Sequence, residues 1–159
     1  VYSHCVGAAI ALRIIKTLEE NGTAVKEYFA AAAIPPSRPS EKNMWRAVSD
    51  RILEAILSNA GAHIKDLSKA KRRDLLTRFR EDTDFANIVY ADFEGKIKTP
   101  VSVIISKDDI FTKNYRQAEK LWLKYVQNLK GVSFVSSESH YFQRDDSDSL
   151  SDIILASDK

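Results

Sequence analysis

Apolar positions change their spacing several times along the chain, and each change predicts a new element. Apolar residues among good helix formers predict a helix over 8–20, which a following Asn-Gly pair ends. The mostly apolar run 25–34, closed by a Pro-Pro pair, is typical of a short strand buried on both faces. Two runs rich in β-branched residues, 101–106 and 132–137, predict further buried strands.

The middle third of the chain, about 40–93, has the spacing of helices and no convincing strand. One helix is expected around 44–57, a second begins after a capping Ser68, and a third is centred on 85–90. This part of the chain is therefore predicted to be entirely helical.

Two more helices are expected in the last third, over 112–129, ended by Gly131, and over 147–156. Strands that alternate with helices and are apolar on both faces indicate an α/β fold. We expect about three parallel strands with flanking helices.

Polar or reactive residues stand where the predicted strands end, which is where ligands bind in a parallel sheet. They are Cys5, the pair Asp108 and Asp109, and His140. Either acid, Asp108 or Asp109, is a candidate, although an Asp pair after a strand is also typical of a helix cap. His4 is expected to point away from the site.

Cys5, the only cysteine, stands between Ser3 and Gly7 directly ahead of the first predicted helix. A nucleophile elbow places its nucleophile on such a strand-to-helix turn, with small residues two positions before and after it. The helix N-terminus would favour the reactive thiolate, and the N–H of Val6 would be one donor to an oxyanion. Ser3 is an alternative nucleophile, but Val1 and Cys5 would crowd its turn. A merely packed cysteine is the other alternative.

Composition narrows the class of protein. A length of 159 residues with 44% apolar residues suits one domain, and a net charge of +2 argues against a nucleic-acid-binding protein. One cysteine makes no internal disulfide, and neither a signal-peptide pattern nor an apolar run of about 18 residues is present, so we interpret the chain as cytoplasmic. The three histidines and the cysteine lack metal-ligand spacing, and the five glycines form no phosphate loop, so no metal or nucleotide is predicted.

Three stretches carry a family resemblance. YSHCVGAAIALRIIKTLEENG (2–22) has an elbow and a first helix, KIKTPVSVIISKDDIFT (96–112) has a late strand followed by an acid, and SESHYF (137–142) has a histidine loop. Together they resemble the thioesterase domains of nonribosomal peptide synthetases, which belong to the α/β-hydrolase family. The resemblance implies a partial α/β-hydrolase fold in which about 40–93 form a helical lid insertion.

The resemblance also implies a catalytic triad in which Cys5 takes the acyl group, His140 moves the proton and Asp109 orients the imidazole. The substrate would be an acyl or peptidyl chain on the phosphopantetheine thiol of an upstream peptidyl carrier domain, released by hydrolysis or cyclisation. No cofactor would be bound directly. The basic run 69–73 would meet an acidic carrier domain or form a solvated helix face. A stand-alone editing thioesterase, another α/β hydrolase and a non-catalytic α/β interaction module stay open as alternatives.

The sequence also departs from the family pattern. Ser3, Ser106 and Ser139 stand where the family has glycines, and 30–33 are alanines where many members hold the acid. A complete member has several strands before the elbow, whereas here residues 1–2 precede it. We therefore expect the C-terminal part of a thioesterase domain, inactive on its own.

Such an incomplete sheet would expose an edge and an apolar face, which proteins tend to cover by association. We predict that the 159-residue chain self-associates or rearranges its N-terminal helix. Sedimentation velocity over a range of concentrations tests the association, and a monodisperse monomer at high concentration would contradict it.

Overall fold

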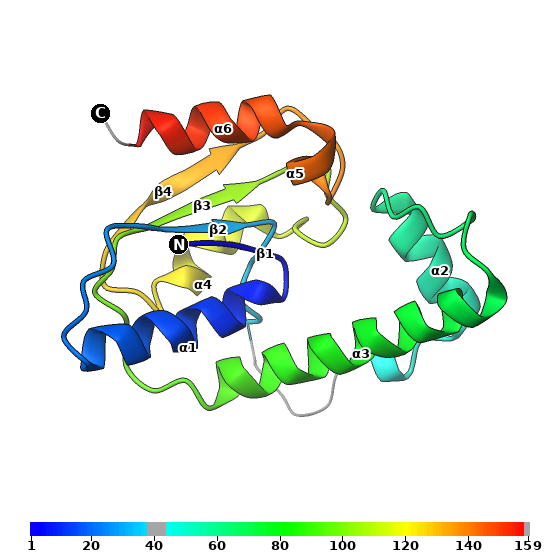
Figure 1. Cartoon of the computed structure of the whole chain (residues 1–159), viewed down its shortest axis with the longest axis horizontal. Helices are drawn as coiled ribbons and strands as arrows, with labels where there is room; N and C mark the ends of the chain where they lie inside the picture. Colours follow the sequence, from blue (N-terminus) through cyan, green and yellow to red (C-terminus); the bar gives the residue numbers. More distant parts are fainter. Residues whose placement is uncertain (38–43, 158–159) are drawn as a thin grey trace.

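A sheet of four parallel strands forms the centre of the protein, whose computed structural model describes residues 1–37 and 44–157. Its strands, in spatial order, are β1 (Tyr2–His4), β2 (Tyr28–Ala31), β3 (Val101–Ile105) and β4 (Leu129–Phe134). Each strand pairs in parallel with the next one along the chain, so all four end at the same edge of the sheet (Figure 1). The expected parallel α/β fold is confirmed, with four strands instead of about three.

Helices cover both faces of this sheet. One face carries α1 (Gly7–Glu20), the end of α3 (Lys69–Ala91) and α4 (Ala118–Trp122), and the other carries α5 (Phe142–Asp145) and α6 (Ser147–Ala156) (Figure 1). Alternate residues of β3 fill the two cores, because successive side chains of a strand point to opposite faces. Val103 and Ile105 pack with α1 and α3, and Ile104 packs with α5 and α6.

The segment between β2 and β3 forms a helical arm that extends beyond the sheet (Figure 1). It contains a short 3-10 helix (Met44–Arg46), α2 (Asp50–Asn59) and the first half of α3. The arm has its own small apolar cluster, formed by the buried Leu53, Leu57, Ile64 and Leu76. Its described part, from residue 44 onward, has no strand, as predicted, and 40–43 lie outside the described residues.

The second and third helices expected in this region are one continuous helix, α3, and the prediction of a break was wrong. The polar residues between the two apolar groups include neither Gly nor Pro, so nothing interrupts the backbone hydrogen bonds. Thr83 in this stretch donates its hydroxyl hydrogen bond to the carbonyl of Phe79, 2.8 Å away, as Thr within a helix commonly does. The expected N-cap is present, since Ser68 Oγ accepts from Lys71 N–H at 3.4 Å.

The prediction of one helix over 112–129 was also wrong. A 3-10 turn (Tyr115–Gln117) precedes α4, and α4 ends at Trp122. The chain after it pairs with a distant segment instead, since Gln127 N–H donates to the carbonyl of Ile97 at 2.9 Å. Gly131, expected to end this helix, lies inside β4 at a register shift, with a φ of 154° that suits glycine.

The other predicted boundaries of helices and strands differ less from the structure. Helices expected over 8–20 and 147–156 are present as α1 and α6. The strand expected over 25–34 is shorter in the structure, and β4 begins a few residues earlier than the expected 132–137.

Trp122 provides a test of how the core supports the loop that follows β2. Its side chain is fully buried, and its Nε1–H donates to the carbonyl of Ala33 at 3.0 Å. Trp122→Phe leaves that carbonyl unpaired and removes part of a large side chain, so we expect the free energy of unfolding to fall by about 2 kcal/mol. Urea denaturation measures this. Ile14→Ala, at a position 51% exposed, is the control and should change stability by less than about 0.5 kcal/mol.

Candidate active site

Cys5 occupies a sharp turn between β1 and α1. Its N–H donates to the carbonyl of Ala31 at 2.9 Å, continuing the ladder of the sheet, and its carbonyl accepts from Ala8 N–H at 3.0 Å, beginning the helix. The residue is left-handed, with a φ of 53°, which costs a non-glycine residue about 1 kcal/mol. The expected strand-to-helix turn is thus present, and its strain is held by hydrogen bonds on both sides.

Small residues border this turn, as the sequence suggested. Gly7 lies next to Ser3 across the turn, since an added Cβ on Gly7 would lie 3.8 Å from Ser3 Cβ, an ordinary contact. Ser3 Oγ lies 2.7 Å from the hydroxyl of the buried Tyr28. Its hydrogen bond is therefore made with the core, which does not favour the alternative of Ser3 as nucleophile.

His140 and Asp109 come together under the carboxyl edge of the sheet. His140 Nδ1 lies 2.8 Å from Asp109 Oδ2, and the side chains are 3% and 0% exposed. Asp109 also accepts the N–H of Phe111 at 2.9 Å and the hydroxyl of Thr112 at 3.0 Å. Asp108 is exposed, so of the two candidate acids it is Asp109 that contacts the imidazole.

The charge state of His140 reflects both of its polar neighbours. Burial by itself lowers the pKa of His140, but hydrogen bonds to Asp109 and Cys5 outweigh it and raise this pKa to about 9. The imidazolium form therefore predominates at pH 7. The structure thus joins His140 to Asp109 by a hydrogen bond and places Cys5 near enough to His140 to raise its pKa.

His4 also lies at this group, so the expectation that it points away was wrong. Its ring meets the ring of His140 edge-on, with centroids 5.2 Å apart, and meets Phe142 at 5.3 Å. Burial and the positive charge of His140 lower the pKa of His4 to about 4, which keeps it neutral at pH 7. The histidine loop covers the face of β1 on which His4 lies, and this long-range packing has no local sequence signal.

Phe111 and Thr112, which follow Asp109 in the chain, also shape the site and were not predicted. The ring of Phe111 meets His140 edge-on at 4.9 Å, and Thr112 donates to Asp109. The N–H two residues after an Asp commonly binds its carboxylate, so the local turn at Phe111 had a recognisable signal. The packing on His140 had none.

Cys5 opens into a cavity of about 210 Å³. One wall is a helical stripe of α3 that includes Phe79, Ala86 and Tyr90, and the opposite wall is the loop 32–36. Val6, the residue whose N–H was predicted to bind an oxyanion, also lines the cavity and precedes the first residue of α1. The cavity is mostly apolar and can hold an acyl chain beside the sulfur.

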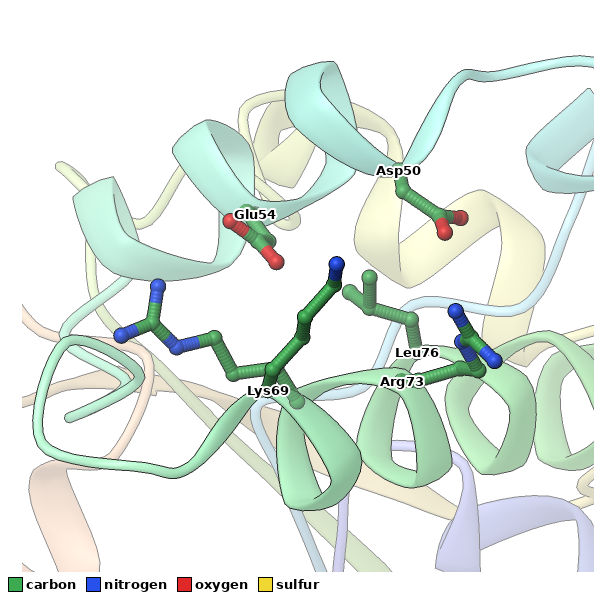
Figure 2. A pocket seen from close by; sticks show the side chains of 6 residues that line it. Asp50, Glu54, Lys69, Arg73 and Leu76 are labelled. Carbon is green, nitrogen blue, oxygen red and sulfur yellow. The ribbon is translucent and has the colours of Figure 1, made fainter.

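A second hollow, of about 420 Å³, lies between α2 and α3 and is strongly charged. Figure 2 shows Lys69 and Arg73 of α3 projecting toward Asp50 and Glu54 of α2. Part of the basic run 69–73 therefore faces carboxylates of the same arm. The nearby carboxylates lessen the net positive charge that this side of the arm offers to a partner.

Within residues 1–37 and 44–157, no three His, Cys, Asp or Glu side chains are grouped so as to hold a metal ion. In the same ranges, no helix is long and apolar enough to cross a membrane.

The parallel sheet, the strained Cys5 turn, and the acid and histidine that follow later strands define an α/β-hydrolase fold, and solved structures agree. No family model matches the sequence, and no curated protein matches it. The chain superposes on human thioesterase 2 with a TM-score of 0.65 at 14% identity, covering 98% of this chain and 70% of that one. The type II thioesterase YbtT of the yersiniabactin pathway gives 0.67 at 18%, covering 98% and 63%.

The epoxide hydrolase VrEH1 from Vigna radiata is also similar, with a TM-score of 0.57 at 13% identity, covering 98% of this chain and 66% of that one. The chain thus spans about two thirds of the length of these structures. At such identities the likeness establishes the fold, and the chemistry has to be argued from the site.

The hydrogen bond between Asp109 and His140 can be tested by titration. In Asp109→Asn the pKa of His140 should fall from about 9 to well below it, because burial still disfavours the imidazolium while the carboxylate is gone. The native pKa of His140 lies above the ordinary 6.5. The contribution of His140 to stability is therefore complete below pH 6.5 and disappears as the pH rises through about 9. NMR titration of the imidazole measures the pKa, and an unchanged midpoint would contradict the assignment.

Proposed function

We propose that this chain is the catalytic part of a thioesterase that releases an acyl or peptidyl chain from the phosphopantetheine thiol of a carrier protein. The single observation that carries the proposal is the buried Asp109–His140 hydrogen bond close to Cys5, which lies on a strained turn beside an apolar cavity. A packed structural cysteine would need neither the strained backbone nor a buried acid and base beside it. This argues against a non-catalytic interaction module.

The geometry supports the following roles in the proposed reaction. The Cys5 thiolate attacks the thioester carbonyl, and the N–H of Val6 at the start of α1 stabilises the negative oxygen that forms. The C–S bond to the carrier breaks, and His140 gives its proton to the departing thiolate. His140 then takes a proton from water, or from a hydroxyl or amine of the chain, as that group attacks the Cys5 thioester. Asp109 holds the imidazole in position throughout.

The substrate class is supported by the names of the structural neighbours. Three of them are named thioesterases, two of these type II thioesterases, from the borrelidin biosynthetic cluster and the yersiniabactin NRPS/PKS pathway. Carrier-borne thioesters are therefore the substrates we propose, with a carrier domain or protein as the partner. An integrated thioesterase domain and a stand-alone editing enzyme share this chemistry.

Another hydrolase of the same fold is the second candidate, because an epoxide hydrolase is among the neighbours. The two candidates differ in their electrophile. Comparison of an acyl pantetheine thioester with the corresponding oxygen ester and with an epoxide separates them.

Mass spectrometry of a complete thioesterase domain that contains this chain, incubated with an acyl pantetheine thioester, tests the proposal. We expect a covalent acyl adduct that Cys5→Ala abolishes and that Asp109→Asn reduces at least tenfold in rate. Ser3→Ala is the matched control, since Ser3 is two residues away and bonds to Tyr28, and it should keep the adduct. An adduct on the Cys5→Ala protein would refute the role of the sulfur.

A further inference from the structure

The helical arm is hydrogen-bonded to the histidine loop at the turn 59–61, at the end of α2. The backbone N–H of His140 donates to the carbonyl of Ala60 at 3.0 Å. Ser139 Oγ lies 3.4 Å from the same carbonyl, and Arg144 of α5 donates to the carbonyl of Gly61 at 3.0 Å. Three hydrogen bonds thus join two segments about 80 residues apart in the chain.

Gly61 fits this contact very tightly. Its φ is 99°, a conformation that L residues rarely adopt, and an added Cβ would lie 2.5 Å from Ser139 Oγ. The same Oγ accepts the backbone N–H of Tyr141 at 3.0 Å, so it cannot move without disturbing the loop. The backbone around His140 is therefore shaped directly against the turn of the arm.

We propose that the turn 59–61 is a positioning element for His140. Through this turn, the packing of α2 on the arm sets the distance between the imidazole and Cys5. The turn touches neither sulfur nor substrate, and it acts through the backbone of residues 139–140. Because the hydrogen bonds fix backbone atoms, a displacement of α2 displaces the imidazole with it. The functional consequence rests on the proposed function, since thioester turnover would require α2 to be packed against the arm.

The packing of α2 supports such a link. Leu53 and Leu57 of α2 are buried against Leu76 of α3, so α2 has a defined position on the arm. The turn then leads directly from Leu57 into the contact, since Ala60 is itself 2% exposed. Rigid packing on one side and hydrogen bonds on the other make the turn a stiff connection.

A double-mutant cycle tests the contact. Gly61→Ala should push Ser139 and slow the alkylation of Cys5 by iodoacetamide at least fivefold at pH 7, because the imidazolium no longer faces the sulfur. Ser139→Gly removes the clashing atoms, so the double variant should recover most of the rate lost by Gly61→Ala. Gly22→Ala is the matched control for backbone strain, since Gly22 has a φ of 75° with nothing within 4 Å, and it should react like the original protein.

Two further measurements separate the possible failures. In the thioester assay, Gly61→Ala should lower kcat with little change in KM, whereas a damaged cavity would raise KM. If the alkylation results hold but no thioester is hydrolysed, the proposed function fails and the positioning role stands. If thioesters are hydrolysed but Gly61→Ala leaves both alkylation and kcat unchanged, or the double variant recovers nothing, the positioning role is refuted.

Arg144→Gln keeps the test decisive if Gly61→Ala does not fold. Arg144 is largely exposed and its guanidinium reaches the carbonyl of Gly61, so the variant should fold while the contact is weakened. A two- to threefold slower alkylation of Cys5 is expected across pH 6–9, partly restored by Arg144→Lys. An unchanged rate in Arg144→Gln would overturn the proposal in that case.

Discussion

The buried hydrogen bond between Asp109 and His140 is the interaction on which the site depends. It joins loops that follow two neighbouring strands, β3 and β4, whose register places Ile105 opposite Phe134 at the carboxyl edge. Parallel pairing makes the two loops leave the sheet side by side, so the acid and the base meet without a long excursion of either. The ion pair is tolerated in the interior because Asp109 also accepts hydrogen bonds from the N–H of Phe111 and the hydroxyl of Thr112.

The candidate site was largely predictable because it obeys two local rules. Reactive residues follow parallel strands, and a cysteine between small residues before a helix is typical of a nucleophile elbow, so spacing indicated Cys5, the pair Asp108 and Asp109, and His140. The choice of Asp109 came from the family resemblance. His4 was placed wrongly because its surroundings are made by the distant histidine loop. The contact of the arm with that loop was invisible for the same reason, since both partners are backbone atoms.

The fold was predicted best where a single period extends over the whole element. The apolar pattern over 112–129 correctly marks buried residues such as Trp122 and Val126, but it cannot separate one helix from a short helix followed by turns. Pairing with Ile97 decided that case, and it acts across the fold. Conversely, the polar middle of α3 was mistaken for a break, although no residue in it disfavours a helix.

The raised pKa of His140 bears on why a cysteine suits this site. At a pKa of about 9 the resting imidazole is protonated, which would disable it as a base for a hydroxyl nucleophile, whereas a thiolate nucleophile needs no such base. In the proposed reaction, acylation of the Cys5 sulfur removes the contributions of Cys5 to this raised pKa and leaves those of Asp109, while burial continues to lower it. The imidazole that has just given its proton to the departing thiol therefore stays neutral more readily. It becomes a competent base at the step where water, or a group of the chain itself, must be activated.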